Sequence, residues 1–323
     1  MKERCILIFG IFAFTFNVIN SQPLPATNEY ISNKFALSKS FSGFYGDLNS
    51  SATYRANWLG FQGAPEYIKA NFDMPMPYDC GLGLSMLNYK VGIFSDFNFE
   101  GTYSLTIPIQ RKHVAYFGLG LQFLRSTVDF GKGKSTDIQD PFIAQNPLSM
   151  SANRLNSSMY IAYNWQKLYG GINISNLFKK ELQNGNVEYP IHRQFEFFAN
   201  YTYDITSSWE AEGFLILNKF KDNKTSFDIT AIAIYEKDLW FGLNWRRPKN
   251  FALTFGTYFS QNIYLNYTAG ITGGPGFSNT LGSHEISLGY RVRTKGAWTT
   301  DSRKSNGLIE KLIEFVGNLF GKQ

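Results

Sequence analysis

Apolar and polar side chains alternate along most of this chain in stretches of strand length. Over 97–107 the odd positions hold Phe, Phe, Gly, Tyr, Leu and Ile, whereas the even positions hold Asn, Glu, Thr, Ser and Thr. Because successive side chains of a β-strand point to opposite faces, this pattern predicts a strand with one apolar face and one polar face. The same alternation recurs in further stretches, at 51–58, 194–204, 263–271 and 285–292.

The alternation predicts about 14 strands, with 12 or 16 as the alternatives, and the connections between them differ in length. Those after the fifth, seventh and thirteenth strands, at 128–154, 177–192 and 272–281, are long or rich in Gly and Pro, whereas those after the even-numbered strands are short. An even strand number with long and short connections at opposite ends is typical of bacterial outer-membrane barrels. The expected strands are 49–58, 65–74, 79–89, 94–107, 113–127, 155–165, 168–176, 193–204, 209–220, 225–236, 239–247, 250–258, 262–271 and 282–292.

Composition arbitrates between a membrane barrel and a soluble β-sandwich, which also alternates. The chain holds 30 Phe and 19 Tyr, and aromatic residues make up 17% of it, yet its mean hydropathy is only −0.22. After the first 21 residues no apolar stretch reaches the ~20 residues that a membrane-spanning helix requires. Transmembrane strands combine outward aromatic girdles with a polar interior. The sequence therefore predicts an all-β transmembrane outer-membrane β-barrel of about 14 antiparallel strands, with a short C-terminal amphipathic helix.

The first 21 residues have the form of a secretory signal peptide. Lys2 and Arg4 precede an apolar core, and cleavage is expected after Ser21. A lipoprotein carries its cysteine at the cleavage junction, and Cys5 is far from that position. Removal of residues 1–21 leaves Cys80 as the one cysteine, which excludes an internal disulfide and makes a small packed residue the expected role of Cys80.

The mature chain is expected to have three parts. Residues 22–48 form an N-terminal periplasmic arm or a partial plug, 49–293 form the outer-membrane β-barrel, and 294–323 form a linker and a C-terminal periplasmic amphipathic helix. Because the short turns of such barrels face the periplasm, both termini are expected there. One face of the helix expected at 307–320 is apolar and is the expected partner-binding face. Its residues are Leu308, Ile309, Leu312, Ile313, Val316, Leu319 and Phe320.

Candidate chemical motifs are weak, and the sequence predicts a protein that is not an enzyme and binds no cofactor or metal. The segment 131–135, Gly-Lys-Gly-Lys-Ser, lacks the first glycine of a phosphate-binding loop, because Val128 stands at that position. Asp137 and Asp140 lack the further ligands of a cation site. The three histidines are separated in the sequence and lack metal-ligand spacing; they are His113, His192 and His284.

Charged residues on the polar strand faces are expected to point into the lumen and to pair with each other or with the N-terminal segment. They include Arg55, Glu100, Glu196, Glu210, Glu212 and Arg291. The net charge is +6, but the cations are scattered, which disfavours nucleic-acid binding. The chain has six Asn-x-Ser/Thr sequences, which is the pattern of N-glycosylation sites, but the polar face of a strand produces this pattern by itself. They begin at Asn49, Asn156, Asn173, Asn200, Asn223 and Asn266.

Four segments of the chain resemble a known family. They are 54–65 (Tyr-Arg-Ala-Asn-Trp-Leu-Gly-Phe-Gln-Gly-Ala-Pro), 70–75 (Ala-Asn-Phe-Asp-Met-Pro), 81–85 (Gly-Leu-Gly-Leu-Ser) and 282–291 (Gly-Ser-His-Glu-Ile-Ser-Leu-Gly-Tyr-Arg). In this order they resemble the PorP/SprF family of type IX secretion-system membrane proteins from Bacteroidetes, over about 28–293. The motif positions are Trp58, Gly60, Phe61, Gly63, Ala64, Pro65, His284, Glu285, Gly289 and Tyr290.

The resemblance implies a noncatalytic outer-membrane component of the type IX secretion and gliding machinery, which assists export or surface attachment of specific cargo such as adhesins. It implies as partners a secreted cargo protein with a type IX C-terminal domain, periplasmic secretion or motility components, and membrane lipid, but no nucleic acid. The loops at 128–154, 177–192 and 273–276 are the expected cargo-docking surface. The alternative is an outer-membrane porin or hydrophobic-solute transporter, for which the barrel argues equally well. A surface hydrolase lacks a catalytic constellation.

Overall fold

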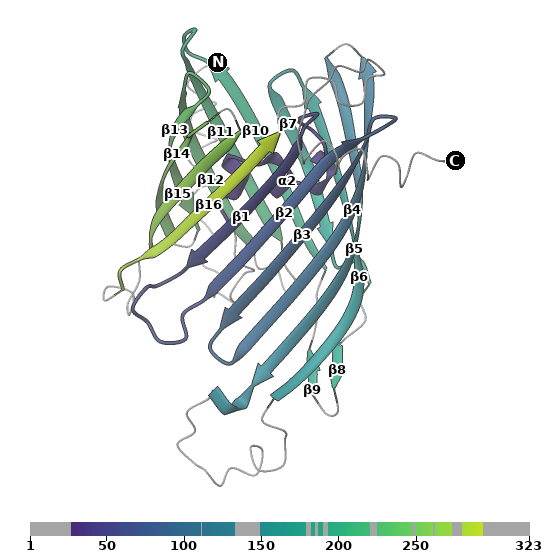
Figure 1. Ribbon diagram of the computed structural model, residues 1–323, viewed down its shortest axis with the longest axis vertical. Helices are drawn as coiled ribbons and strands as arrows, with labels where there is room; N and C mark the ends of the chain where they lie inside the picture. Colours follow the sequence, from purple (N-terminus) through teal and green to yellow (C-terminus); the bar gives the residue numbers. More distant parts are fainter. Residues whose placement is uncertain are drawn as a thin grey trace, which may run out of the picture.

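The computed structural model describes residues 27–292, except 111, 133–148, 179–181, 185–186, 190–192, 220–224, 248–249, 261 and 273–279. These residues form one closed antiparallel barrel of 14 strands, in which the first strand pairs with the last (Figure 1). The strands are β1 (Leu48–Ala56), β2 (Glu66–Met76), β3 (Cys80–Val91), β4 (Phe94–Gln110), β5 (His113–Asp129), β6 (Ser149–Trp165), β7 (Leu168–Ser175), β10 (Gln194–Asp204), β11 (Trp209–Lys219), β12 (Thr225–Tyr235), β13 (Leu239–Arg246), β14 (Asn250–Tyr258), β15 (Ile263–Thr272) and β16 (Ser283–Val292).

The predicted all-β barrel of 14 strands is confirmed. The largest difference in a boundary is in β6, which begins at Ser149 rather than 155. A second difference is a small separate hairpin in the long connection after β7, made of β8 (Leu182–Asn184) and β9 (Val187–Tyr189). Among the described residues, no helix is long and apolar enough to cross a membrane. The predicted signal peptide and C-terminal helix lie outside the described residues.

The two ends of the barrel differ in their connections. At one end, here called the turn end, the strands are joined by 77–79, 111–112, 166–167, 205–208, 236–238 and 259–262, and β1 begins and β16 ends there. At the other end, here called the loop end, the connections include 57–65, 130–148, 176–193 and 273–282 (Figure 1, bottom). The predicted separation of long and short connections is therefore confirmed. Strands β4, β5 and β6, of 17 residues each, exceed the ~9–11 residues that span a bilayer.

Side chains alternate between the two faces of the barrel wall as the sequence predicts. Outward residues are apolar and exposed; examples are Leu119, Leu121 and Leu243, at 65%, 74% and 64% exposure. Lumen-facing residues are polar and buried, and Ser158 and Ser287 are 0% exposed. The asparagines of five of the six Asn-x-Ser/Thr sequences are buried on this inner face, at Asn49, Asn156, Asn173, Asn200 and Asn266. A polar strand face therefore accounts for them.

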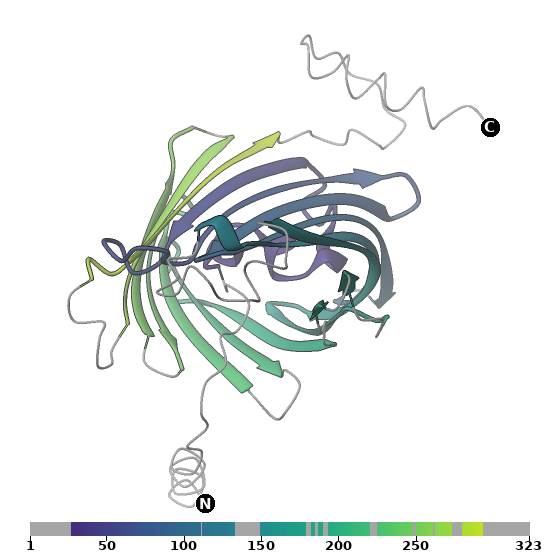
Figure 2. The same ribbon diagram turned by 90° about the horizontal axis from the view of Figure 1, so that it is seen from below.

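The N-terminal segment lies inside the barrel (Figure 2). It consists of three short helical turns, η1 (Glu29–Ile31), α2 (Lys34–Leu37) and η2 (Lys39–Phe41), followed by turns that lead to β1. The side chains of Asn33 and Ser38 accept backbone N–H groups at the starts of α2 and η2, which stabilises turns too short to persist alone. Residues 28–46 are called the plug below.

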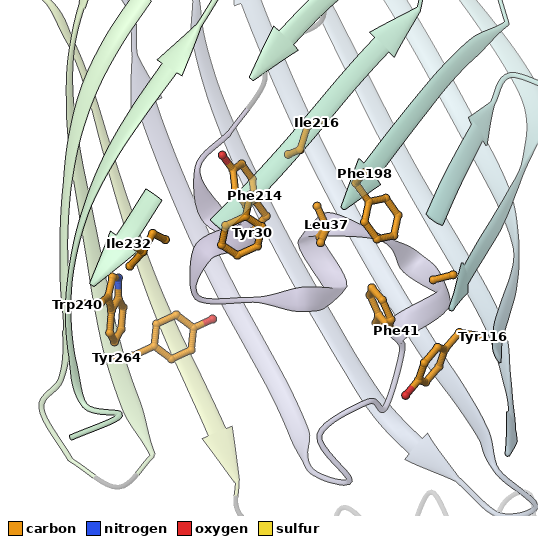
Figure 3. Packing of buried hydrophobic residues seen from close by; sticks show 11 residues of the cluster. Tyr30, Leu37, Phe41, Tyr116, Phe198, Phe214, Ile216, Ile232, Trp240 and Tyr264 are labelled. Carbon is orange, nitrogen blue, oxygen red and sulfur yellow. The ribbon is translucent and has the colours of Figure 1, made fainter. Parts of the chain in front are cut away.

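Apolar side chains of the plug pack against apolar side chains on the otherwise polar inner wall (Figure 3). Phe41 is fully buried and makes edge-to-face contacts with Tyr116 and Phe198, with ring centroids 5.0 and 6.1 Å apart. Tyr30 packs in the same way on Phe214, at 5.1 Å. Burial of a large apolar side chain contributes about 1.5–3 kcal/mol, so these contacts form an apolar core between the plug and the wall.

Candidate functional site

The plug is fixed to the wall by buried charges, beginning with Glu29. Its carboxylate accepts hydrogen bonds from Ser51 (2.5 Å) and Asn71 (2.6 Å), and Lys69 Nζ lies 3.2 Å from its second oxygen. Burial by itself opposes ionisation, but Lys69 and these two hydrogen bonds hold the pKa of Glu29 below its ordinary value. Glu29 is therefore an ionised anchor between the plug and strands β1 and β2.

A second anchor joins the start of the plug to the first and last strands. The backbone N–H of Asn28 donates to Glu285 Oε1 (2.8 Å), and the other oxygen of Glu285 pairs with Arg55 Nη1 (3.1 Å). The side-chain oxygen of Asn28 accepts from Arg246 (3.2 Å), which pairs with Asp228 (2.7 Å). The family-motif residue Glu285 thus holds both the β1–β16 seam and the plug.

Two lysines of the plug are held by the wall on other sides. Lys34 Nζ lies 3.6 Å from Glu212 and 4.2 Å from the centre of the Tyr169 ring. Lys39 Nζ donates to Asn71 Oδ1 (3.0 Å) and lies over the ring of Phe35, a residue of the plug itself. Burial, followed by repulsion from Lys69, lowers the pKa of Lys39 to about 7, so its ammonium form is costly in this place.

Three glycines of the inner wall let the plug approach closely. A Cβ at Gly81 would lie 2.0 Å from the carbonyl oxygen of Ser42, and one at Gly83 would lie 2.4 Å from the Phe35 ring. At Gly118 it would lie 3.1 Å from Ser40 Cα. The resemblance segment 81–85 thus contains two of the residues on which the plug rests.

A cavity of about 140 Å³ remains between the plug and the wall of β6, β7, β10 and β11. The plug segment 36–39 lines one side of it, and Ser175, which ends β7, and Gln194, which begins β10, line it toward the loop end. The wall is polar and includes one carboxylate, that of Glu196, which accepts a hydrogen bond from Asn173 (2.7 Å).

The two ends of the family resemblance meet at the loop end. The turn 57–65, which joins β1 to β2, exchanges backbone hydrogen bonds with the segment before β16: Leu59 N–H donates to Gly282 (2.8 Å) and Leu281 N–H donates to Leu59 (3.0 Å). Gly60 and Gly63 have φ of 92° and 74°, a conformation that glycine adopts without strain. The glycines of this motif therefore shape a turn whose backbone hydrogen bonds extend the pairing between β1 and β16 past the ends of these strands.

Gly289 and His284, two further residues of the family motif, contact neighbouring residues of the barrel wall. Gly289 lies under the ring of Tyr264, which leaves no space for a Cβ. His284 Nε2 donates a hydrogen bond to the carbonyl of Leu281 (3.0 Å), and His284 Nδ1 is hydrogen-bonded to the hydroxyl of Tyr267 (2.6 Å). The apolar face predicted for partner binding, at 307–320, lies outside the described residues, as do His192, Asp137 and Asp140. Within the described ranges no cluster of His, Cys, Asp or Glu has a metal-binding arrangement.

Sequence reasoning missed how the plug is anchored and the cavity beside it. Of the charges expected in the lumen, Arg55 pairs with Glu285, Glu212 pairs with Lys34 of the plug, and Arg291 donates to the carbonyl of Ser32. Glu100 and Glu196 form no ion pair within the described residues, which differs from the expectation. Cys80 differs from expectation, because it is only partly buried and its sulfur accepts a hydrogen bond from Tyr103 (2.7 Å). The available signal for the plug was the set of apolar residues on the polar face, such as Phe198.

A closed antiparallel barrel with an apolar outer face and a polar, filled lumen defines this chain as an outer-membrane β-barrel protein. Residues 19–290 match the family described as type IX secretion system membrane protein PorP/SprF, and the chain belongs to that family. It is therefore an outer-membrane component of type IX secretion, with a secretion or structural role rather than a catalytic one.

Solved structures similar to this chain include outer-membrane proteins of low sequence identity. The Pseudomonas putida toluene transporter TodX is 8% identical with a TM-score of 0.47, over 76% of this chain and 89% of that one. Omp33 of Acinetobacter baumannii is 5% identical with a TM-score of 0.46, over 77% and 97%. A FadL homologue of Pseudomonas aeruginosa is 7% identical with a TM-score of 0.42, over 76% and 87%. No curated protein sequence matches the chain.

Proposed function

We propose that this protein is a plugged outer-membrane platform that holds specific exported cargo at the cell surface, as a noncatalytic partner of the type IX machinery. The observation that carries the proposal is the plug, which is anchored through Glu29, Asn28 and Lys34 and occupies the lumen of a barrel that belongs to a secretion family. A filled lumen favours binding at the barrel ends over diffusion of solutes through the centre. It therefore argues against an open porin. A plugged lumen also occurs in outer-membrane transporters, so the alternative of a hydrophobic-solute transporter is disfavoured by the family match alone.

The orientation in this proposal follows from the connections. Outer-membrane barrels have short turns in the periplasm and longer loops outside the cell. The loop end then faces the outside, and the turn end, where Leu48 begins β1 and Val292 ends β16, faces the periplasm. The cargo-binding surface is the set of loop-end connections 128–154, 177–192 and 273–276, because loops on a rigid scaffold are where binding usually resides.

Deletion of 131–146 tests the loop surface. We expect the barrel to assemble normally, since β5 and β6 pair through 17 residues each, and the amount of cargo retained at the surface to fall. Heat-modifiable gel mobility reports assembly, and copurification from native outer membranes reports cargo. Undiminished cargo with normal barrel levels contradicts this part of the proposal.

The tail is proposed to bind a periplasmic partner through the apolar face of its helix at 307–320. A helix of this length needs a surface to bury its apolar stripe. The paired changes Leu312→Asp and Val316→Asp place charge on that stripe and should reduce copurified machinery without affecting assembly. Lys311→Asp with Asn318→Asp puts the same residues on the polar face and is the matched control. Equal recovery of partners from both double variants rejects a docking role for the tail.

A further inference from the structure

One carboxylate, that of Glu196, lines the cavity between the plug and the wall, and no cation of the described residues pairs with it. Glu196 accepts one hydrogen bond, from Asn173, and forms no ion pair within the described part of the chain. By contrast, Glu29, Glu212 and Glu285 each pair with a lysine or an arginine. Glu100 and Asp73 on the inner wall also have no ion pair within the described residues, but hydrogen bonds from Tyr160 and from Asn49 and Gly43 satisfy them. Glu196 differs because it is the carboxylate that lines the cavity.

The strand register concentrates hydrogen-bonding groups around this carboxylate. Tyr160, Asn173, Glu196 and Asn218 are directly opposite one another on β6, β7, β10 and β11, and so form one row across the inner wall. Ser175 and Gln194 are paired in the next row toward the loop end. The side-chain amides and hydroxyls beside Glu196 are neutral and offer further acceptor oxygens.

The lysine that lines the same cavity does not neutralise Glu196. The ammonium of Lys39 donates to Asn71 on β2 and lies 3.8 Å from the centre of the Phe35 ring, and therefore points away from β10. Lys34, the other lysine of the plug, is paired with Glu212. The cavity is therefore lined by one carboxylate that neither lysine of the plug contacts.

The size of the cavity limits the occupant. At about 140 Å³ it is smaller than the ~300–1,000 Å³ pockets that bind whole organic ligands. It is also larger than the ~30 Å³ that one water molecule occupies in the liquid. A single flexible side chain with a charged tip fits these limits. Ala36, Leu37 and the ring of Tyr160 supply apolar surface for a methylene stem, as long cationic side chains require.

We infer that this cavity binds an organic cation, the alkylammonium or guanidinium tip of a molecule that enters from the loop end and pairs with Glu196. This inference rests on the proposed function in one respect: on that function the cation is a lysine or arginine side chain of the docked cargo. An ammonium has three N–H donors and no acceptor, which suits a carboxylate surrounded by amide and hydroxyl oxygens.

The test uses the purified full-length protein in detergent and n-butylammonium chloride as the probe, with n-butanol as its neutral counterpart. Saturation-transfer NMR measures the affinity. Glu196→Gln keeps the shape and the acceptor oxygen for Asn173, and should weaken butylammonium binding by about 10- to 100-fold, as expected for loss of a charge-assisted hydrogen bond. Glu210→Gln removes the same charge near the turn end of β11, where Glu210 faces Lys237, and should leave the affinity unchanged.

A gain of affinity provides a second readout that does not depend on the behaviour of Glu196→Gln. Asn218→Asp adds a carboxylate directly opposite Glu196, and should tighten butylammonium binding while butanol binding stays the same. Equal affinity for butylammonium in the wild type, Glu196→Gln and Asn218→Asp overturns the inference. Heat-modifiable mobility confirms that each variant is a folded barrel.

Cargo copurification distinguishes the two sources of the cation. If Glu196→Gln loses both butylammonium and cargo, the cation is a side chain of the cargo. If it loses butylammonium but retains cargo, the cavity binds a free amine and the link to cargo is rejected. If the wild type binds butylammonium through Glu196 but retains no cargo, the proposed function fails while the cavity assignment stands.

Discussion

Replacement of Gly83 by alanine is expected to loosen the plug while the barrel stays closed. The new Cβ would lie 2.4 and 2.5 Å from two ring carbons of Phe35, whereas carbon atoms pack best at about 3.5–4.0 Å. The ring cannot move aside easily, because Phe35 is fully buried and the Lys39 ammonium lies over it. The methyl group therefore forces a shift of about 1 Å on the plug.

The magnitude follows from the cost of overpacking. Extra methyl groups in a well-packed interior cost about 1–3 kcal/mol, and this cost falls on the docked state alone, because a released plug leaves space at Gly83. The population of the released plug should rise by about 5- to 150-fold. The backbone hydrogen bonds of β3 with β2 and β4 remain, so the barrel itself should be unaffected.

Hydrogen exchange followed by mass spectrometry measures this population. Peptides from 28–46 should exchange faster in Gly83→Ala than in the wild type, while peptides from the strands exchange at the same rate. Gly101→Ala is the matched control: Gly101 lies on the outer face of β4, where the nearest atom to a new Cβ is Leu84 Cδ2 at 3.8 Å. If Gly83→Ala and Gly101→Ala give the same exchange in the plug, the inference that the Phe35 ring packs closely against Gly83 is wrong.

Three further outcomes are expected. Arg55→Met leaves the buried Glu285 carboxylate without its cation and should destabilise the barrel by about 3–5 kcal/mol, measured as a lower temperature for the gel-mobility shift, whereas Lys167→Met in an exposed pair should not shift it. Because burial lowers the pKa of Lys39 to about 7, the docked plug binds fewer protons than the released plug above that pH; protection of the plug from protease should therefore increase from about pH 7 to about pH 10, and Lys39→Met should abolish the increase. Deletion of 28–46 should produce ion conductance in planar bilayers where the wild type has little; equal conductance would show that the plug does not close the lumen.

Strand number, strand faces and the asymmetry of the two ends were predictable because all three depend on a pattern of period two. In lipid every backbone group must be paired within a closed wall, so the apolar and polar sets cannot exchange faces without burying charge in the membrane. Exceptions to the pattern carried information as well. Phe198, Phe214 and Ile216 are apolar residues on the polar face, and each of them packs in the cluster around the plug.

The plug contacts and the cavity were not predictable, because they join residues far apart in the sequence. The three turns of the plug have no periodic apolar face, and their positions depend on where β1, β11 and β16 present Ser51, Glu212 and Glu285. Similarly, the glycines at 81 and 83 read as small strand residues until Phe35 and Ser42 are placed against them.

The anchor between Asn28 and Glu285 ties the order of assembly to the last strand. These residues are 257 positions apart, and Glu285 also pairs with Arg55 across the seam where β16 meets β1. Contacts of such long sequence separation form late, after the loop-closure entropy has been overcome. Closure of the barrel and full anchoring of the plug are therefore one event. A barrel that still lacks β16 has neither a closed seam nor a fully anchored plug.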